Sequence, residues 1–284
     1  MLNTWQFNLI GYLIAIIFFF QFYKLAVKNT ARDGASTVLL QITAGLSVLA
    51  LSPFLAFKFP TDLKFYLLLL GACIFYALND RMQTTARRHL EVSAYSILNQ
   101  LSNVFLIIIG VLVFRESVTL AKILGASLIL GGNGVLLYKK QRFELNKYSI
   151  IAILASIVFA IAISIDIGIS RQFNLPFYIM LTLIVPAIFV YFGERIKLSE
   201  VIAEYNSRAR NYYLITGIAW GFVIFFSLRA FQLGKVTTIV PLEATAVLMN
   251  VVVAVILFKE RDNLPKKIFA AALVIVGVYA TVLA

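Results

Sequence analysis

Several long apolar stretches of this sequence contain polar or ionisable side chains, and the clearest case is Glu243 within residues 236–258. Asn250 follows seven residues later, so on one continuous helix the two side chains share a face. Placing an ionised carboxylate in hydrocarbon costs about 2.5–3.5 kcal/mol on insertion scales, so such a group faces a cavity or a partner. Two interpretations stay open. Glu243 binds a proton or a cationic group, or it is a structural carboxylate paired with Arg229 or Arg171.

A second polar face runs along the apolar stretch 92–114. Its members recur at spacings of three and four residues, which places them on one broad side of a helix. They are Tyr95, Ser96, Asn99, Gln100 and Asn103. Because a hydrogen bond between membrane helices contributes only about 0.6 kcal/mol on average, helix association does not require so many polar groups. The pattern therefore predicts that this face lines a water-filled cavity.

A third polar group lies late in the stretch 63–86 and comprises Asn79, Asp80, Arg81 and Gln83. One interpretation is a gate or a substrate contact at the rim of a cavity. The other is a helix end that emerges among lipid headgroups, where an arginine side chain extends toward water. Asp166, late in its own apolar stretch, allows the same two interpretations.

Trp220 and Tyr76 are aromatic residues of further apolar stretches, as is Tyr12. Their rings could bind an aromatic or a cationic ligand. Packing between helices is the alternative role for such rings. We keep Trp220 and Tyr76 as candidate substrate contacts.

The residue types needed for catalysis or metal binding are scarce. The chain has one cysteine, Cys73, which excludes an intrachain disulfide, and one histidine, His89, which we expect in a loop. The glycines of Gly131-Gly132-Asn133-Gly134 lie inside an apolar stretch, where they favour close helix packing and not phosphate binding. A membrane-embedded enzyme would need clustered His, Asp or Glu at one interface. We therefore expect no catalytic residues, no metal, no cofactor and no enzymatic activity.

The composition indicates which elements position these residues. Of 284 residues, 61% are hydrophobic and 13% are charged, and the mean hydropathy is +0.92. Soluble domains are about 45–50% apolar and about 25% charged. The excess is more than one globular core of this size can bury, which excludes a soluble enzyme, and disordered chains are far less apolar. A polytopic membrane protein remains.

About 20 apolar residues span a bilayer as a helix, and ten segments qualify. They are residues 7–27, 36–57, 63–86, 92–114, 119–138, 148–170, 175–193, 211–231, 236–258 and 263–283. The fold class is therefore an all-α polytopic membrane protein with ten transmembrane helices. The longest gap, 194–210, is either a short interfacial helix or a plain loop.

The ten spans divide five and five at the basic stretch 139–144, and a shift of 144 residues aligns residues 92–138 with 236–282. Phe114-Arg115-Glu116 then lies on Phe258-Lys259-Glu260, and Asn99 lies on Glu243. A repeat with an odd number of spans inserts with its copies inverted, as in many secondary transporters. The sequence predicts two inverted five-helix repeats, residues 1–140 and 145–284.

These two units, each with a Phe-basic-Glu motif followed by a small-residue-rich span, resemble the EamA-type units of the drug/metabolite transporter superfamily. The resemblance implies a ten-helix basket in which the third, fourth, eighth and ninth helices line a central cavity. It implies that the fifth and tenth helices help hold the halves together. The sequence departs from the usual pattern where Arg115 and Lys259 replace a glycine that often precedes the glutamate.

From the resemblance and the polar faces together we expect a secondary transporter, specifically an exporter of a small metabolite such as an amino acid or a drug-like compound. It would work by alternating access and be coupled to protons. The alternative is a carrier of lipid-linked or nucleotide sugars with the same fold. The expected partners are the small-molecule substrate and the lipid bilayer, with no nucleic acid, and the chain would be a monomer or a homodimer in the cell (inner, cytoplasmic) membrane.

The basic residues predict an orientation. Of the 25 Lys and Arg residues, 18 fall on one side of the ten predicted spans and 7 on the side of both termini. The positive-inside rule places the richer side in the cytoplasm and both termini outside. The family resemblance implies the reverse orientation, with both termini inside.

Overall fold

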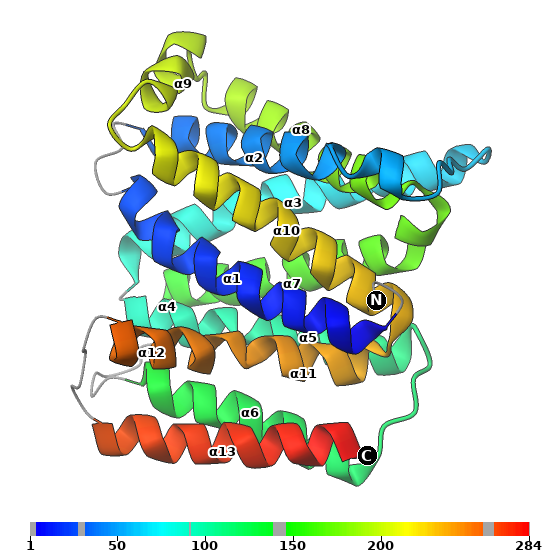
Figure 1. Ribbon diagram of the computed structural model, residues 1–284, viewed down its shortest axis with the longest axis vertical. Coiled ribbons are helices and arrows are strands. Elements are labelled where there is room, and N and C mark those ends of the chain that lie inside the picture. The colour runs from blue at the N-terminus through cyan, green and yellow to red at the C-terminus, as the bar shows by residue number, and fades with distance from the viewer. Residues whose placement is uncertain (1–3, 28–31, 91, 139–145, 258–263, 284) are drawn as a thin grey trace. The chain divides into compact units, whose positions relative to one another are not determined.

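The computed structural model describes residues 4–27, 32–90, 92–138, 146–257 and 264–283, and the elements within these ranges are helices (Figure 1). Two features of the repeat prediction, the divider 139–144 and the motif Phe258-Lys259-Glu260, lie outside the described residues.

The helices follow one another along the chain as α1 (Trp5–Val27), α2 (Asp33–Leu49), η1 (Ser52–Phe54), α3 (Leu63–His89), α4 (Val92–Asn99), α5 (Leu101–Leu112), α6 (Leu120–Leu137), α7 (Lys147–Ile169), η2 (Ser170–Gln172), α8 (Leu175–Gly193), α9 (Leu198–Tyr205), α10 (Arg210–Leu233), α11 (Val236–Ala244), α12 (Ala246–Leu257) and α13 (Leu264–Leu283). Side chains begin several of them: Asn174 accepts a hydrogen bond from the backbone nitrogen of Phe177 at the start of α8, and Asn146 accepts from Tyr148 and Ser149 at the start of α7.

Eight helical segments of the described part are long and apolar enough to cross a membrane, which agrees with eight of the ten predicted spans. The other two predicted spans, 92–114 and 236–258, differ from the expectation, because each is divided into two shorter helices. The divisions fall at Gln100, between α4 and α5, and at Thr245, between α11 and α12. The fold is therefore all-helical and polytopic, and the ten-span inverted repeat stays a prediction.

The chain forms two compact units. Unit 1 consists of residues 1–77 and 165–233, and unit 2 of residues 78–164 and 234–284. Each unit takes helices from both halves of the sequence, and α3 and α7 contribute to both. Units defined by packing therefore differ from repeats defined by sequence. The two predicted repeats, residues 1–140 and 145–284, stay a prediction.

In unit 1, α10 packs along α1 on one side and α2 on the other, and α2 also packs on α8 (Figure 1). Glycines bring α10 close to α2. A Cβ atom at Gly221 would lie 2.7 Å from the carbonyl oxygen of Ala44, and one at Gly217 would lie 3.2 Å from that of Leu40. Small residues let membrane helices gain van der Waals contact along their backbones, which holds α2 and α10 together.

In unit 2, the last helix, α13, lies alongside α6 (Figure 1). Gly125 and Gly277 face each other there, since a Cβ atom on either would lie 2.7 Å from the carbonyl oxygen of the other. Ile129 and Val274 are buried beside them. The small residues that the sequence places in both helices therefore form their contact surface.

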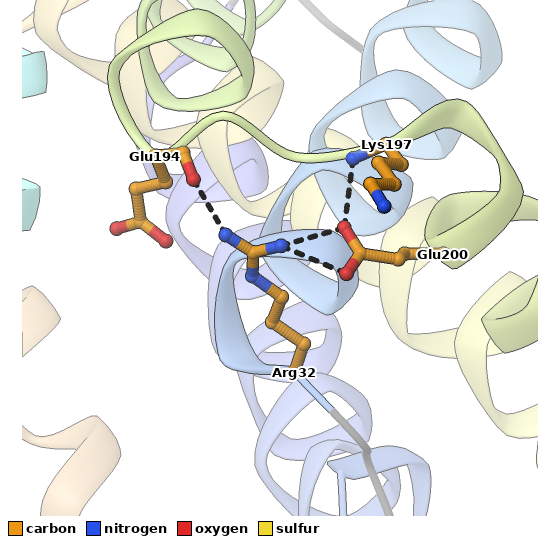
Figure 2. A network of polar contacts seen from close by, with 4 residues as sticks. All are labelled: Arg32, Glu194, Lys197 and Glu200. Carbon is orange, nitrogen blue, oxygen red and sulfur yellow. Dashed lines mark hydrogen bonds and ion pairs between the residues drawn. The ribbon is translucent and has the colours of Figure 1, made fainter.

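An ion pair joins the beginning of α2 to the segment after α8. The Arg32 guanidinium binds both carboxylate oxygens of Glu200 at 2.7 and 2.8 Å (Figure 2). It also donates to the backbone carbonyl of Glu194, whose side chain points away from it (Figure 2). Glu200 accepts a further bond from the backbone nitrogen of Lys197 at 2.7 Å, which closes the first turn of α9. The gap 194–210 therefore contains a short helix, and the plain-loop alternative is wrong.

The Phe114-Arg115-Glu116 motif forms the connection after α5. Arg115 has a φ angle of 53°, in the left-handed region that suits glycine. This backbone conformation gives a physical reason for the glycine that the resemblance implies at this position. Glu116 accepts hydrogen bonds from the backbone nitrogens of Val236 and Thr237, both at 2.8 Å, and so caps the start of α11.

His89 is not in a loop as predicted, but is the last residue of α3. Its Nδ1 lies 2.9 Å from the carbonyl oxygen of Thr85, and its ring stacks on Tyr148 with centroids 3.9 Å apart. These two contacts hold the exposed His89 ring at the end of α3, against Tyr148 in the first turn of α7.

Candidate functional site

The polar face predicted along 92–114 is interrupted by a turn at Gln100. The backbone nitrogens of Gln100 and Asn103 bind carbonyl oxygens three residues earlier, each at 3.1 Å, in place of the α-helical partner four residues earlier. Ser102 Oγ donates to the carbonyl oxygen of Asn99 at 2.7 Å, and Ser156 on α7 donates to that of Leu98 at 3.1 Å. Side-chain hydroxyls therefore satisfy carbonyl oxygens next to the break.

Four polar side chains of α3 and α4 form an amide cluster in unit 2. Gln83 Nε2 donates to the side-chain oxygen of Asn79 at 3.1 Å and lies 3.5 Å from that of Asn99. Tyr95 OH lies 3.4 Å from the same Asn99 oxygen. The structure thus brings together three residues of the predicted site, Asn79, Tyr95 and Asn99, with Gln83 between two of them.

On the other side of the turn, Asn103 Nδ2 donates to Gln100 Oε1 at 3.0 Å. Gln100 lines a cavity of about 170 Å³ between α4, α5 and α6, whose other lining residues are apolar: Ile97, Leu101, Val104, Leu130 and Gly134. The predicted stripe is therefore divided by the turn at Gln100, with Asn99 in the amide cluster and Gln100 at this cavity.

Glu243 and Asn250 lie on opposite sides of the second break. Thr245 begins a tighter turn, with its backbone nitrogen and its hydroxyl both donating to the carbonyl oxygen of Leu242, at 3.1 and 2.6 Å. Asn250 Nδ2 donates to the carbonyl oxygen of Ala246 within its own helix at 2.9 Å. The expectation of one continuous helix through Glu243 and Asn250 is therefore wrong, since the turn at Thr245 divides it, and the shared face of the two side chains stays a prediction. Glu243 itself is half-buried near the end of α11.

Asn133 is a buried polar residue whose role the sequence analysis missed. It is fully buried on α6, and its Nδ2 donates to the carbonyl oxygen of Ala244 at 2.7 Å, directly at the break between α11 and α12. An unsatisfied carbonyl in an apolar interior is costly, and Asn133 removes that cost. The available sequence signal was a lone asparagine inside an apolar stretch, which the neighbouring glycines obscured.

In unit 1, Asp166 is buried, 1% exposed, and bound by two tyrosines. Tyr76 OH donates to one carboxylate oxygen at 2.7 Å, and Tyr178 OH donates to the other at 2.6 Å. The tyrosines come from α3 and α8, and Asp166 from α7. Among the described residues no cation forms an ion pair with Asp166, so two neutral hydroxyls stabilise it. Asp166 and Tyr76 are separate candidates in the sequence, whereas no sequence pattern indicated Tyr178.

The two remaining predicted site residues, Trp220 and Asp80, are not among the polar contacts described above. Trp220 on α10 packs against Phe19 on α1, with ring centroids 4.8 Å apart. Asp80 is half-buried on α3, one residue after Asn79. Their contact with a substrate stays a prediction.

Comparisons with known proteins add three findings. Residues 8–138 match the EamA-like transporter family. A solved structure described only as "Crystal structure of protein" is similar at a TM-score of 0.76 and 15% identity, with 99% of each chain covered, which shows a shared fold. No curated protein matches the sequence.

Proposed function

We propose that the whole chain is a secondary transporter of the drug/metabolite transporter superfamily that exports a small polar metabolite by alternating access, because residues 8–138 match the EamA-like transporter family. The main supporting observation is the pair of helix breaks at Gln100 and Thr245. Discontinuous helices in corresponding positions of two repeats are typical of substrate sites in secondary transporters. The breaks are 145 residues apart, within one residue of the shift that aligns the two sequence halves.

The chemistry around the breaks favours a polar, hydrogen-bonding substrate. The amide cluster offers both donors and acceptors without a full charge, and Glu243, two residues before Thr245, adds one carboxylate. A ligand with an amino group and further polar atoms, such as an amino acid or an amine-containing drug, would use both kinds of group. We propose Glu243 as the carboxylate that carries the coupling proton.

The substrate can be sought by thermal unfolding of the purified protein in the presence of amino acids, sugars, nucleotide sugars and cationic drugs. We expect an amino acid or an amine to raise the unfolding temperature and to be transported in proteoliposomes. Stabilisation by nucleotide sugars alone, with transport of the same compounds, would contradict the proposed substrate class.

The site can be tested separately from the substrate. Cysteines at positions 99 and 103, in a Cys73→Ser background, should react with a water-soluble maleimide, and the identified substrate should slow the reaction. A cysteine at the lipid-exposed position Ile108 provides the control. Labelling at 99 and 103 by lipid-soluble reagents only would show that the polar face is buried between helices.

The Glu243→Gln variant tests the proposed proton coupling. This variant should insert and fold but should transport at a rate that no longer depends on a pH gradient. A variant that is less stable, with unchanged pH dependence, would assign Glu243 the structural role instead.

A further inference from the structure

A basic cavity of about 220 Å³ lies in unit 1, whereas the helix breaks belong to unit 2. It is bounded by the segment after η1, by η2 with the start of α8, and by the end of α10, and it is lined by Lys58, Arg171, Arg229 and Gln232 together with Leu55, Ala56, Phe173 and Leu175. Three of these eight side chains are cationic and none is acidic. The proposed transport site uses none of them.

Gln232 holds the two guanidinium groups at one wall of this cavity. Its backbone carbonyl accepts a hydrogen bond from Arg171 Nη2, and its side-chain oxygen accepts one from Arg229 Nη1 at 3.0 Å. Gln232 is buried, and its own amide donates to Ser170 Oγ at 3.1 Å, which fixes its orientation. The two arginines are therefore held in place by a buried residue and do not extend freely into solvent.

Lys58 completes the group from the opposite segment. Its Nζ donates to the backbone carbonyl oxygen of Arg171 at 3.3 Å, and its side chain lines the same cavity as the two arginines. Concentrating positive charge in this way is unfavourable unless an anion neutralises it.

The carboxylates closest in sequence to Lys58 and Arg171 have other partners. Asp62 pairs with Lys64 at 3.0 Å, and both oxygens of Asp166 accept bonds from tyrosines. Within the described part of the chain, Lys58 and Arg171 form no ion pair. Arg171 uses one of its five N–H donors there, on the Gln232 carbonyl, which leaves the planar donor face of its guanidinium for a ligand.

We propose that this cavity binds a phosphate group. Two anchored guanidiniums and an ammonium match a phosphate, which carries up to two negative charges and several acceptor oxygens, better than a carboxylate with one charge. Phe54 and Phe57, on the segment leading to Lys58, are 84% and 74% exposed, as expected of apolar side chains at a surface that contacts lipid. A phosphate group can reach this position from water or as a lipid headgroup, and both sources offer the same chemistry.

The experiment uses the full-length protein in two arms. In detergent, the unfolding temperature is measured while inorganic phosphate is titrated at constant ionic strength against chloride. In nanodiscs, it is measured in phosphatidylcholine alone and in phosphatidylcholine mixed with phosphatidic acid. We expect a rise in at least one arm: a response to inorganic phosphate indicates a soluble source, and a response to phosphatidic acid alone indicates a lipid headgroup.

Variants locate the response. Lys58→Gln with Arg171→Gln should weaken the apparent affinity by about tenfold or more, because charge-assisted hydrogen bonds are lost. Lys64→Gln is the matched control, since Lys64 lies six residues after Lys58, at the start of α3, but pairs with Asp62 and does not line the cavity, and it should keep the response. Lys58→Gln alone, at an exposed position, serves if the double variant does not fold.

Two results would overturn the proposal. One is the absence of any response in both arms, and the other is a response of unchanged affinity in the cavity variants. Neither result bears on the transport proposal, since the cavity lies wholly within unit 1 and shares no residue with the helix breaks.

Discussion

Glu116 binds Thr237 twice, at the backbone nitrogen at 2.8 Å and at the hydroxyl at 2.7 Å, across 121 positions of sequence. Through this carboxylate, the motif after α5 holds the first turn of α11, the helix that ends at the second break. Its acidic charge also lies at the positive end of that helix.

The cap can be removed at Glu116. Glu116→Ala should lower the free energy of unfolding by about 1–2 kcal/mol, because the first backbone donors of α11 lose their acceptor. Glu116→Gln, which keeps one oxygen, should lose less. Thermal unfolding in detergent measures both, and an alanine variant as stable as the wild type would contradict the capping role.

A substitution at Arg115 should stabilise the protein. Because its φ angle is 53°, Arg115→Gly relieves the left-handed conformation and should raise the free energy of unfolding by about 1 kcal/mol. Arg115→Ala is the control, since alanine keeps the Cβ atom and the strain. A glycine variant no more stable than the alanine variant would show that no strain is stored there.

Because Asp166 and Tyr178 share a hydrogen bond, we expect their substitutions to lower the free energy of unfolding in a non-additive way. Asp166→Asn replaces one accepting oxygen by a donor, so one tyrosine hydroxyl loses its partner, and the cost should be about 1–3 kcal/mol. Tyr178→Phe should have its own cost, and the double variant should cost less than the sum of the two. Additive losses in a double-mutant cycle would show that Asp166 and Tyr178 do not interact.

Glu200 makes the stability depend on pH. The backbone N–H of Lys197 and the Arg32 guanidinium hold the pKa of the Glu200 carboxyl below its ordinary value of 4.5. A lowered pKa in the folded state means that the stabilisation is present above pH 4.5 and is lost as the pH falls through the folded value. Glu200→Gln should therefore be less stable than the wild type at pH 7, with a difference that shrinks on acidification. Ser199→Ala, a neighbouring exposed change, should show no such trend.

The side of the membrane on which the carboxyl terminus lies tests the predicted orientation. With 18 basic residues on one side of the predicted spans and 7 on the other, the positive-inside rule places both termini outside. A carboxy-terminal alkaline phosphatase fusion should then be active, and a fluorescent-protein fusion dim. The opposite pair of results would place the termini in the cytoplasm, as the family resemblance implies.

The sequence could predict most helices because an uninterrupted run of about 20 apolar residues reports a span directly. It could not predict the breaks at Gln100 and Thr245. Both depend on hydrogen bonds from other helices, as from Asn133 to the Ala244 carbonyl and from Ser156 to the Leu98 carbonyl. Such donors become available only when the helices pack.

The candidate site shows the same limit. Spacing within one helix correctly suggested that Tyr95 and Asn99 lie together, because neighbours at four residues share a face. Spacing could not show that a turn separates Glu243 from Asn250, and it had no means of joining Asp166 to Tyr178, which belongs to another helix.

The reciprocal contact of Gly125 and Gly277 has a mechanical consequence. A side chain in place of either glycine would collide with the backbone of the other helix. Sliding α13 along α6 would move each glycine away from the backbone that it accommodates and bring side chains against that backbone, so the close contact holds the two helices in register. We therefore expect α6 and α13 to move together as one rigid body in any conformational change, with the bending in other elements.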